Sequence, residues 1–484
     1  ISAPFPSWKR GGAVLIGACL IGLCIFGIRG RTGYNPIKVS AAYFCQDAFL
    51  NQLGVSPTFN LLTSVMDDMR PENKYLHLMD EQEAITKAQA LLNRPGDANV
   101  SPLAVYRRAA KADSVQQRRP NVVLIMMESM SAKFMKHFGQ SETLTPFLDS
   151  LYTRSISFRN FYSAGIHTNH GLYATLYSFP AMMKRNLMKG SVIPRYSGLP
   201  TVLKENGYYN LFFMTHEGQY DNMNAFFRTN GYDEVFSQED YPADKVVNSF
   251  GVQDDFLYDY AIPVLNQRAA TGQPFFATLL SISNHPPYVI PPFFHPKTSE
   301  PEMQIVEYAD WALRQFFEEA RKQPWFDNTI FVLEGDHGKL VGDAECELPE
   351  SYNHIPLMIY SNRIQPEEKT TFGGQVDIQP TILGLLNIDY LQNNFGVDLL
   401  KEERPCMFYT ADNMVVGRND TLLYLYNYET QQELTYDIGN GKLNAVPMDD
   451  SFLPLKEYSF SMLQSAEFLV KHGKTLNSIP FTQQ

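Results

Sequence analysis

An acidic residue and a histidine lie side by side in the stretch 329–338, which reads T-I-F-V-L-E-G-D-H-G. The apolar run before them is typical of a buried strand, and ligands bind outside the carboxyl ends of strands in open α/β sheets. Asp336 and His337 offer one oxygen and one nitrogen ligand, which suits a divalent metal ion. Gly335 and Gly338 predict a sharp backbone turn around them. The alternative is an Asp-His-Gly turn without chemistry.

Chemically useful side chains also follow other predicted strands. Glu128 comes directly after the apolar run N-V-V-L-I-M-M, and His216 and His285 each follow a further predicted strand. Glu128, Asp336 and His337 would together supply two oxygens and one nitrogen, a set that fits Mn, Zn or Mg. Several such residues at the carboxyl ends of strands are expected of an active site on a doubly wound sheet.

Thr168 is the candidate for a further metal ligand and for a nucleophile. It lies at the start of a helix predicted over 168–177, where the backbone N–H groups and the helix dipole favour an anion such as phosphate. A hydroxyl bound to a metal ion loses its proton more readily and becomes a usable nucleophile. The alternative is a plain helix cap, because Thr is common at that position.

Four further histidines are open to two interpretations each. His285 precedes two prolines and could donate to a phosphate oxygen or protonate a leaving group, or it could be a polar turn residue. His354 could serve a second metal ion or the substrate, although a lone histidine is a weak signal. His167 and His170 could steer a phosphate or lie on a solvated surface.

Strand-like runs that alternate with helix-like segments predict an α/β fold with a largely parallel sheet, covered by helices on both faces. Strands are predicted at 121–127, 157–161, 210–215, 274–283, 329–333, 356–361 and 406–410. Helices are predicted at 145–151, 168–177, 306–322 and 377–386. A β-meander over 421–438 and a helix over 455–472 are expected to close the chain.

The uncharged run 12–28 has 17 residues, and a helix of this length would just cross the core of a bilayer. Basic residues on both flanks leave its orientation open. The alternatives are the core of a signal peptide, which is usually shorter, and a buried helix. The chain begins with Ile1 rather than Met, so we expect a further segment upstream.

The composition describes a globular protein, with 44% hydrophobic and 19% charged residues. A net charge of −12 argues against a nucleic-acid partner, which would need clustered Lys and Arg. The spacing of the five cysteines predicts neither a zinc knuckle nor a disulfide framework. We expect a transmembrane region at 1–30, a helical linker at 31–119 and a separate domain at 120–484, and the resemblance described next implies that the linker packs on a catalytic domain.

In their order and spacing these residues resemble the lipoteichoic acid synthase family of phosphoglycerol transferases, within the sulfatase-type, alkaline-phosphatase-like superfamily. The motifs that carry the resemblance are N-V-V-L-I-M-M-E-S at 121–129, F-Y-S-A-G-I-H-T-N-H-G at 161–171, S-I-S-N-H-P-P-Y at 281–288, V-E-Y-A-D-W-A-L-R-Q-F-F at 306–317, E-G-D-H-G at 334–338, N-H-I-P-L at 353–357 and G-Q-V-D-I-Q-P-T at 374–381. The resemblance implies the alkaline-phosphatase-like fold with a small β-rich C-terminal portion.

The resemblance also implies a role for each residue of the predicted metal set. Glu128, Asp336 and His337 would bind one divalent cation, with Mn the expected metal and Zn or Mg the alternatives. Thr168 would be both a metal ligand and the nucleophile that forms a phosphoryl-threonine intermediate. Glu334, which precedes the pair in the motif, would be a supporting residue rather than a ligand.

Substrate contacts are implied for three histidines. His285 matches the substrate-binding histidine of the family, and His216 occupies the position of a histidine in the substrate pocket. In related phosphoethanolamine transferases, His285 and His354 would lie near a second metal ion or the transferred group. We therefore predict His285, His216 and His354 as substrate-binding residues.

The function implied is transfer of a phosphoglycerol-type headgroup from a phospholipid donor to a glycan or lipid acceptor. The enzyme would be anchored in the cell membrane, with several membrane helices before an extracytoplasmic catalytic domain. Thr168 stands where sulfatases carry a Cys or Ser, which disfavours sulfate-ester hydrolysis. No Arg precedes Arg228 in the headgroup region that begins at His216, so the headgroup stays open. The alternatives are a phosphoethanolamine transferase, a phosphodiesterase or phosphatase, a sulfatase, and an inactive binding domain.

Overall fold

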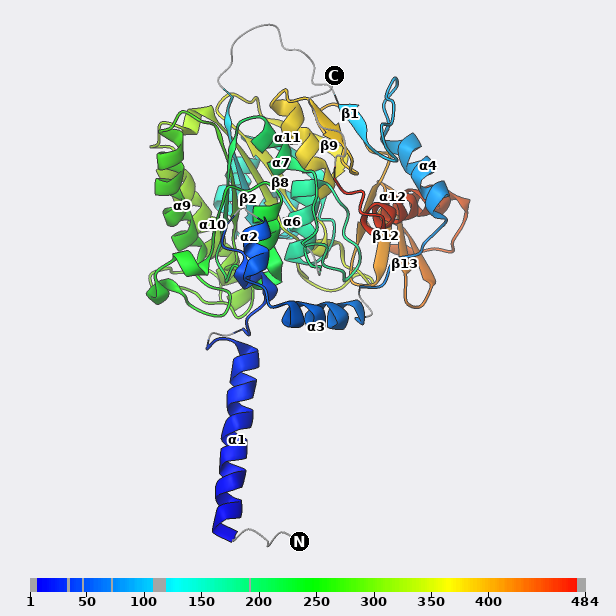
Figure 1. The fold of residues 1–484 in the computed structure, drawn as a ribbon. Coiled ribbons are helices and arrows are strands. Elements are labelled where there is room, and N and C mark those ends of the chain that lie inside the picture. Colours follow the sequence, from blue (N-terminus) through cyan, green and yellow to red (C-terminus); the bar gives the residue numbers. More distant parts are fainter. Residues whose placement is uncertain are drawn as a thin grey trace.

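The computed structural model describes residues 7–32, 35–45, 48–70, 73–107, 119–190 and 193–476. Its centre is an eight-stranded sheet with helices on both faces (Figure 1). In spatial order the strands are β5 (Glu234–Phe236), β4 (Tyr209–Met214), β6 (Phe275–Leu280), β2 (Asn121–Met127), β7 (Thr329–Gly335), β8 (Leu357–Tyr360), β3 (Ile156–Tyr162) and β9 (Glu367–Gly374). The predicted alkaline-phosphatase-like α/β architecture is confirmed.

One strand of this sheet runs against the others. β8 pairs antiparallel with both β7 and β3, whereas the remaining pairings are parallel. The strand predicted over 274–283 ends at Leu280, and 281–288 form a loop without regular structure. β9 was not predicted, because its first five residues are polar. In the structure they lie at the edge of the sheet and are exposed or half-buried.

The continuous apolar run of β2 reflects burial on both faces of the sheet. Its seven residues are all buried, and they alternate between two hydrophobic cores. Val122, Leu124 and Met126 pack in one core, and Val123, Ile125 and Met127 pack in the other. The first core is covered by α6 (Thr168–Tyr177), α7 (Leu199–Glu205), α8 (Met223–Thr229) and α11 (Ile378–Leu385). The second is covered by α5 (Pro146–Tyr152), α9 (Asp254–Ala269) and α10 (Pro301–Ala320).

A second, antiparallel sheet of five strands forms the C-terminal portion. Its strands are β11 (Met407–Thr410), β12 (Met414–Arg418), β13 (Leu422–Asn427), β14 (Gln432–Asp437) and β15 (Asn444–Ala445). The closing helix α12 (Leu453–Lys471) packs on this sheet and on α4 (Glu81–Leu92). A short pair, β1 (Val105–Arg107) with β10 (Tyr390–Gln392), also joins the part of the chain before residue 120 to the domain.

A buried ion pair ties α12 to the central sheet. Arg404 donates to both oxygens of Asp377 just before α11, and also to the hydroxyl of Tyr458 in α12. Both charged side chains are almost fully buried. Removing one partner would leave the other charge buried and unpaired.

We expect Arg404→Met to lower the free energy of unfolding by about 3–5 kcal/mol. Chemical denaturation of the full chain in detergent, followed by circular dichroism, would measure the change. Arg363→Met is the matched control, because Arg363 is exposed and surface pairs contribute at most about 1 kcal/mol. Equal stability of the two variants would contradict this role of Arg404.

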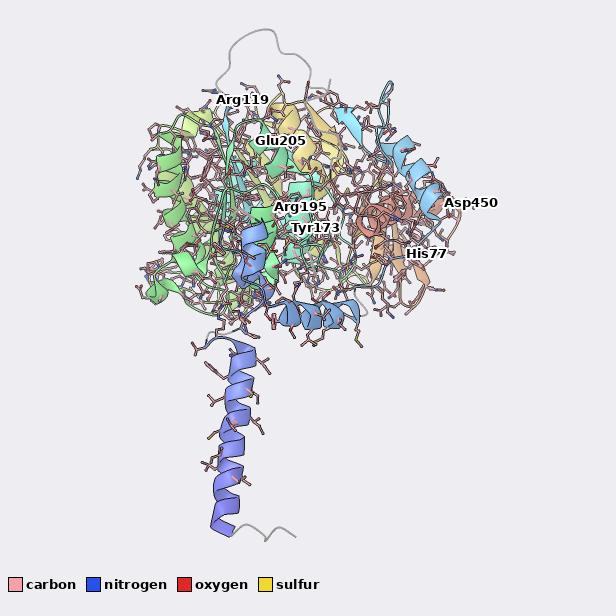
Figure 2. The ribbon with its side chains drawn as sticks, viewed as in Figure 1. His77, Arg119, Tyr173, Arg195, Glu205 and Asp450 are labelled. Carbon is pink, nitrogen blue, oxygen red and sulfur yellow. The ribbon has the colours of Figure 1, made fainter. Side chains whose placement is uncertain are left out.

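The N-terminal helix α1 (Ser7–Arg29) projects from one end of the domain (Figure 1). Over Gly11–Arg29 its mean hydropathy is 2.4 and none of it is buried, so by length and composition it could cross a membrane. The chain after α1 is bound to the domain, because Arg31 forms an ion pair with Glu217 at 2.7 Å. Figure 2 places Arg119 and Glu205 at the opposite end of the domain.

Two short helices follow α1 at the same end of the molecule. They are α2 (Ala48–Leu53) and α3 (Pro57–Asp68), and α3 runs crosswise to α1 along the edge of the domain (Figure 1). Ser56 caps α3 through its hydroxyl, which accepts from the N–H of Phe59, and Pro57 occupies the first turn.

Candidate active site

Glu128, Asp336 and His337 lie together because their strands are neighbours. β2 and β7 pair in parallel, with Met127 opposite Gly335, so the next residue of each strand is a carboxylate at the same edge. One ligand atom of each of the three side chains lies within 4.8 Å of the others. The Nε2 atom of His337 is 3.8 Å from Glu128 Oε1 and 3.6 Å from Asp336 Oδ2.

The hydrogen bonds of this cluster leave metal-binding atoms free. Asp336 Oδ1 accepts from the N–H groups of Ser129 and His337, at 2.8 and 2.7 Å. Its Oδ2 is buried and has no hydrogen-bond partner in the described part of the chain. His337 Nδ1 lies 2.8 Å from the carbonyl oxygen of Gly338, so Nδ1–H donates there and the lone pair of Nε2 is left for a metal ion.

The electrostatics of the cluster also fit a cation. Burial, together with the charge of Glu128, raises the pKa of Asp336 to about 7. Burial acts to lower the pKa of His337, but Asp336 and Glu128 outweigh it and raise that pKa. Two carboxylates that are 1% and 0% exposed repel each other in a medium of low dielectric constant, and a bound cation would offset this repulsion. The residues present therefore fit a divalent metal ion.

Thr168 is the first residue of α6, as expected from the sequence. Its hydroxyl lies 3.4 Å from Glu128 Oε2, which places the predicted nucleophile beside the metal cluster. The preceding residue, His167, makes no side-chain cap, so the N-terminus of α6 is not satisfied by its own cap residue. The arrangement is suited to an anionic group held between the helix N-terminus and a cation.

Gly171 allows α6 to approach the end of β7. A Cβ atom at this position would lie 2.3 Å from the carbonyl oxygen of Asp336 and 2.9 Å from Nε2 of Gln375. We expect Gly171→Ala to displace α6, and with it Thr168, by a fraction of an ångström, and to lower turnover by about 10–100-fold. Comparison of the turnover rates of the variant and the wild type would measure the effect. A variant that turns over at the wild-type rate would contradict this account of the glycine.

The two glycines of the metal turn lie close to the backbone of neighbouring segments. Neither Gly335 nor Gly338 has a positive φ angle, so a left-handed backbone conformation is not the reason for glycine at these positions. They permit close packing instead, because a Cβ atom on Gly335 would lie 2.4 Å from the carbonyl oxygen of Met130. One on Gly338 would lie 2.0 Å from that of Ser351.

His216 and His285 lie in loops that border the cluster. His216 is buried, its Nε2 has no partner among the described residues, and its ring lies 4.6 Å from that of Tyr220. Burial lowers the pKa of His216, against the opposing charges of nearby acidic residues that include Glu128. His285 is half-buried, with its Nδ1 2.6 Å from the carbonyl oxygen of Pro286, and no hydrogen bond of its Nε2 is found among the described residues. Each of the two histidines thus has one ring nitrogen without a hydrogen-bond partner in that part of the chain.

His354 has structural partners in the described part of the chain. Its Nε2 lies 2.8 Å from the carbonyl oxygen of Arg159, and its ring stacks on Tyr162. Its backbone carbonyl accepts from the N–H of Ala132. No described hydrogen bond or ion pair links it to the metal cluster. The contacts with Arg159 and Tyr162 hold the segment just before β8 against β3.

The other two histidines of the sequence analysis flank Thr168 in different environments. His167 is exposed, and its Nε2 is hydrogen-bonded to Asp412 Oδ1 at 2.7 Å. His170 is fully buried, and burial lowers its pKa well below the usual value. Neither ring nitrogen of His170 has a partner among the described residues, so a solvated surface position is wrong for His170.

Several supporting residues were not identified from the sequence. Ser129, at a positive φ of 50°, donates to Glu128 Oε1 at 2.7 Å. Gln375 donates to the carbonyl oxygens of Gly335 and Asp336, and accepts from the N–H of Ala164 near Thr168. Such roles depend on tertiary contacts that no local pattern encodes. The strained φ at Ser129 is of the kind found at functional sites.

The loop of His285 is fixed to the metal cluster by a polar network. Asn284 donates to the carbonyl oxygens of Glu128 and Ser129, both at 3.1 Å. Lys339 in turn donates to Asn284 Oδ1 at 2.7 Å, and burial lowers the pKa of Lys339 to about 8. Lys339 directly follows the D-H-G motif. That position was the one signal in the sequence that could have revealed the positively charged side chain at this site.

A second polar group lies beside Thr168 on the side of His216. Asn169 donates to Asp221, which also pairs with Lys189 at 2.9 Å. Burial opposes ionisation of Asp221, but Lys189 outweighs it and lowers the pKa. Asp221 and Asn222 both have positive φ angles, 46° and 67°, and strain of this kind gathers at binding sites. Arg228, by contrast, donates to Asn224 of its own helix α8 and to the carbonyl oxygen of Val235 in β5.

The model of the sulfatase family matches residues 120–388. The chain belongs to the sulfatase family. The region matched contains the metal cluster, Thr168, and the loops of His216 and His285, so the family is assigned on the part of the chain that builds the site. The predicted resemblance to lipoteichoic acid synthases within this superfamily is confirmed.

Similar proteins include lipoteichoic acid synthases. Lipoteichoic acid synthase 1 of Bacillus subtilis (strain 168) is 25% identical over 350 residues, covering 66% of this chain and 53% of that protein. Lipoteichoic acid synthase of Staphylococcus aureus (strain USA300) is 23% identical over 374 residues, covering 68% of this chain and 54% of that protein. This sulfatase-family chain thus spans about half the length of these relatives.

Solved structures show the same fold. A protein of the alkaline phosphatase superfamily from Vibrio parahaemolyticus superposes with a TM-score of 0.73 at 26% identity, covering 83% of this chain and 98% of that chain. The lipoteichoic acid synthase LtaP from Listeria monocytogenes gives a TM-score of 0.63 at 21% identity, covering 73% and 93%.

Proposed function

We propose that this sulfatase-family protein is a membrane-anchored, metal-dependent phosphotransferase. It would move a phosphoglycerol-type headgroup from a phospholipid to a glycan or lipid acceptor through a phospho-threonine at Thr168. The observation that carries the proposal is the position of Thr168, at the start of α6 and 3.4 Å from Glu128 in the carboxylate–histidine cluster. The similar lipoteichoic acid synthases support the type of headgroup.

The metal site would be formed by Glu128, Asp336 and His337, with Thr168 as a further ligand. A divalent cation, for which Mn is our first candidate and Zn or Mg the alternatives, would neutralise phosphoryl charge and favour the ionised hydroxyl. The chain itself positions the hydroxyl, because Gly171 and Gln375 hold α6 against the end of β7. His337 is oriented by its bond to Gly338.

The transfer would take place in two displacements. The Thr168 hydroxyl gives up its proton and its oxygen forms a bond to the phosphorus of the donor, while the bond from phosphorus to the diacylglycerol oxygen breaks and that oxygen takes up a proton. A hydroxyl of the acceptor then gives up its proton and bonds to the phosphorus, the bond from phosphorus to the Thr168 oxygen breaks, and that oxygen takes up a proton. His285, whose Nε2 has no hydrogen-bond partner among the described residues and whose loop is fixed to Glu128 by Asn284, is our candidate for the proton donor. His216 is our candidate for a substrate contact.

Several features bear on where the protein works. α1 supports a membrane anchor, with the catalytic domain outside the cytoplasm as its relatives suggest, and a lipid donor is consistent with such an anchor. We also propose the boundaries 1–30, 31–119 and 120–484 for anchor, linker and catalytic domain. His354 stays a weaker candidate for the substrate pocket, given its bonds to β3.

The proposal is tested by mass spectrometry of the full chain with Mn²⁺ and labelled donors. Incubation with phosphatidylglycerol should add the mass of a phosphoglycerol group to the peptide that contains Thr168, with release of diacylglycerol. Incubation with phosphatidylethanolamine serves as the comparison. An adduct from that donor alone would show that the transferred headgroup is phosphoethanolamine and not phosphoglycerol. An adduct on another residue, or none with either donor, would overturn the mechanism.

A phosphodiesterase or phosphatase, in which water replaces the acceptor, is the second candidate function. The same site would serve it, since the residues that hold the phosphoryl group do not distinguish water from a sugar hydroxyl. Product analysis with and without a glycolipid acceptor separates the two. Free phosphoglycerol as the sole product in both cases would favour the hydrolase.

A further inference from the structure

The polarity of α3 is reversed relative to a helix that packs on a soluble domain. Such a helix buries its apolar side chains and exposes its polar ones. In α3 and its C-cap the exposed stripe is apolar, with exposed fractions between 48% and 77%. This apolar face consists of Leu61, Leu62, Val65, Met66 and Met69. Their spacing of three or four residues places them on one side of the helix.

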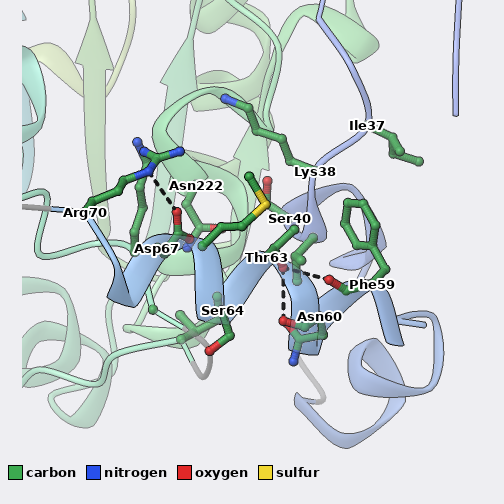
Figure 3. Close-up of a pocket in the computed structure, with 15 residues that line it drawn as sticks. Ile37, Lys38, Ser40, Phe59, Asn60, Thr63, Ser64, Asp67, Arg70 and Asn222 are labelled. Atoms are coloured by element: carbon green, nitrogen blue, oxygen red, sulfur yellow. Dashed lines mark hydrogen bonds and ion pairs between the residues drawn. The ribbon is translucent and has the colours of Figure 1, made fainter. Parts of the chain in front are cut away.

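The polar side chains of α3 face the domain instead. Asn60, Thr63, Ser64 and Asp67 are half-buried and line a cavity of about 270 Å³ between α3 and the catalytic domain, which Phe59 and part of Met66 also border (Figure 3). Lys38 and Lys189 line the same cavity. The apolar side of α3 could have been buried against the domain, because the helix already lies on the domain surface. Folding of the domain alone therefore does not explain why this side is exposed.

The position of the apolar face identifies what covers it. α3 lies at the end of the domain from which α1 projects, and crosswise to α1 (Figure 1). The exit of α1 is fixed there, because Arg31 pairs with Glu217 and the N–H of Lys38 donates to Gln219. If α1 spans a bilayer, α3 lies at the level of the membrane surface (Figure 1). Helices with one apolar face bind in the plane of such a surface.

We infer that the apolar face of α3 docks on the surface of the lipid bilayer that α1 spans. The inference rests on the membrane anchor in the proposed function and adds to it a second membrane contact. Because Lys189 lines the cavity behind α3 and pairs with Asp221, and Asp221 bonds to Asn169, this contact would hold the site of Thr168 at a fixed distance from the lipid headgroups.

Photo-crosslinking of the full chain in vesicles tests the inference. The vesicles contain phosphatidylcholine and phosphatidylglycerol with alkyne-tagged acyl chains, and benzoyl-phenylalanine replaces one residue at a time. At Leu62 we expect a lipid adduct as the main product. At Glu205, at the opposite end of the domain (Figure 2), we expect none. Lipid adducts at equal yield in the two positions, or a dimer of the chain as the main product at Leu62, would overturn the inference.

A position in α1 separates this inference from the membrane anchor itself. Leu20, which is exposed in the centre of α1, should also give a lipid adduct. Adducts at Leu20 without adducts at Leu62 would overturn the docking of α3 and leave the anchor in place. Absence of adducts at both positions would overturn the anchor and, with it, the docking.

A charged variant supplies a functional readout. Leu62→Glu with Met66→Glu should lose the adduct formed through a probe at Val65 and should lower turnover of phosphatidylglycerol in vesicles. In detergent micelles, where no bilayer surface exists, the same variant should turn over at the wild-type rate, which also shows that it folds. Wild-type turnover in vesicles together with an undiminished adduct would contradict the role of the apolar face.

Discussion

Thr168→Ala is expected to lower turnover of the phospholipid donor by at least about 10³-fold and to remove the covalent adduct. The physical reason is that water would have to replace a nucleophile already positioned beside Glu128 at the N-terminus of α6. Thr168→Ser keeps the hydroxyl but loses the β-branch that restricts its rotamer, so we expect a loss of only about tenfold. Initial rates and the mass of the peptide measure both variants.

Two controls make this result specific. The variant should keep metal-induced thermal stabilisation, because Glu128, Asp336 and His337 are unchanged. Thr86→Ala, in the surface helix α4, should leave turnover at the wild-type level. If Thr168→Ala proceeds at the wild-type rate, Thr168 is not the nucleophile. If its rate falls only because metal is no longer bound, Thr168 acts as a ligand alone.

The elements that carry the site were predictable because their sequence signals are local. β2 and β7 are buried on both faces, so each is a continuous apolar run followed by a carboxylate. α6 begins at Thr168 as expected, after Gly165-Ile166-His167. Parallel strands then bring Glu128 and Asp336 to one edge, so pairing of the two carboxylates follows from the class of fold.

What the sequence did not predict depends on contacts between distant segments. The antiparallel direction of β8 is fixed by its neighbours β7 and β3, since a short apolar strand has no intrinsic direction. Gln375 is recognisable only once its amide is seen between Ala164 and Asp336.

His354 illustrates the limit of a histidine taken alone. Before a predicted strand, a histidine that binds substrate and one that bonds to a backbone carbonyl have the same local sequence. The partner at 2.8 Å, the carbonyl oxygen of Arg159, belongs to another strand. The helix α3 was not predicted from the sequence, and the spacing of its apolar residues alone does not say which side faces the domain.

Asp336→Asn is expected to separate metal binding from folding. In the metal-free protein, Asp336 and Glu128 are buried carboxylates whose repulsion, together with burial, raises the pKa of Asp336. The amide side chain of the variant would keep the oxygen that accepts from Ser129 and His337 while removing one charge. The metal-free variant should therefore be more stable than the wild type, by about 1–3 kcal/mol. It should lose the stabilisation that Mn²⁺ confers on the wild type and most of the turnover.

Asp310→Asn is the matched control, because its carboxylate is also buried, and burial likewise raises its pKa to about 7. Each Asp310 oxygen accepts a backbone N–H, from Phe147 and from Leu148, and an amide can replace only one acceptor. This variant should lose about 1–3 kcal/mol and keep its full response to Mn²⁺. In thermal melts of the metal-free protein we therefore expect changes in stability of opposite sign for the two substitutions. Melts with Mn²⁺ should show stabilisation by the metal for Asp310→Asn only. If the Asp336→Asn protein is less stable than the wild type without metal, or is still stabilised by Mn²⁺, Asp336 is not a ligand of the metal.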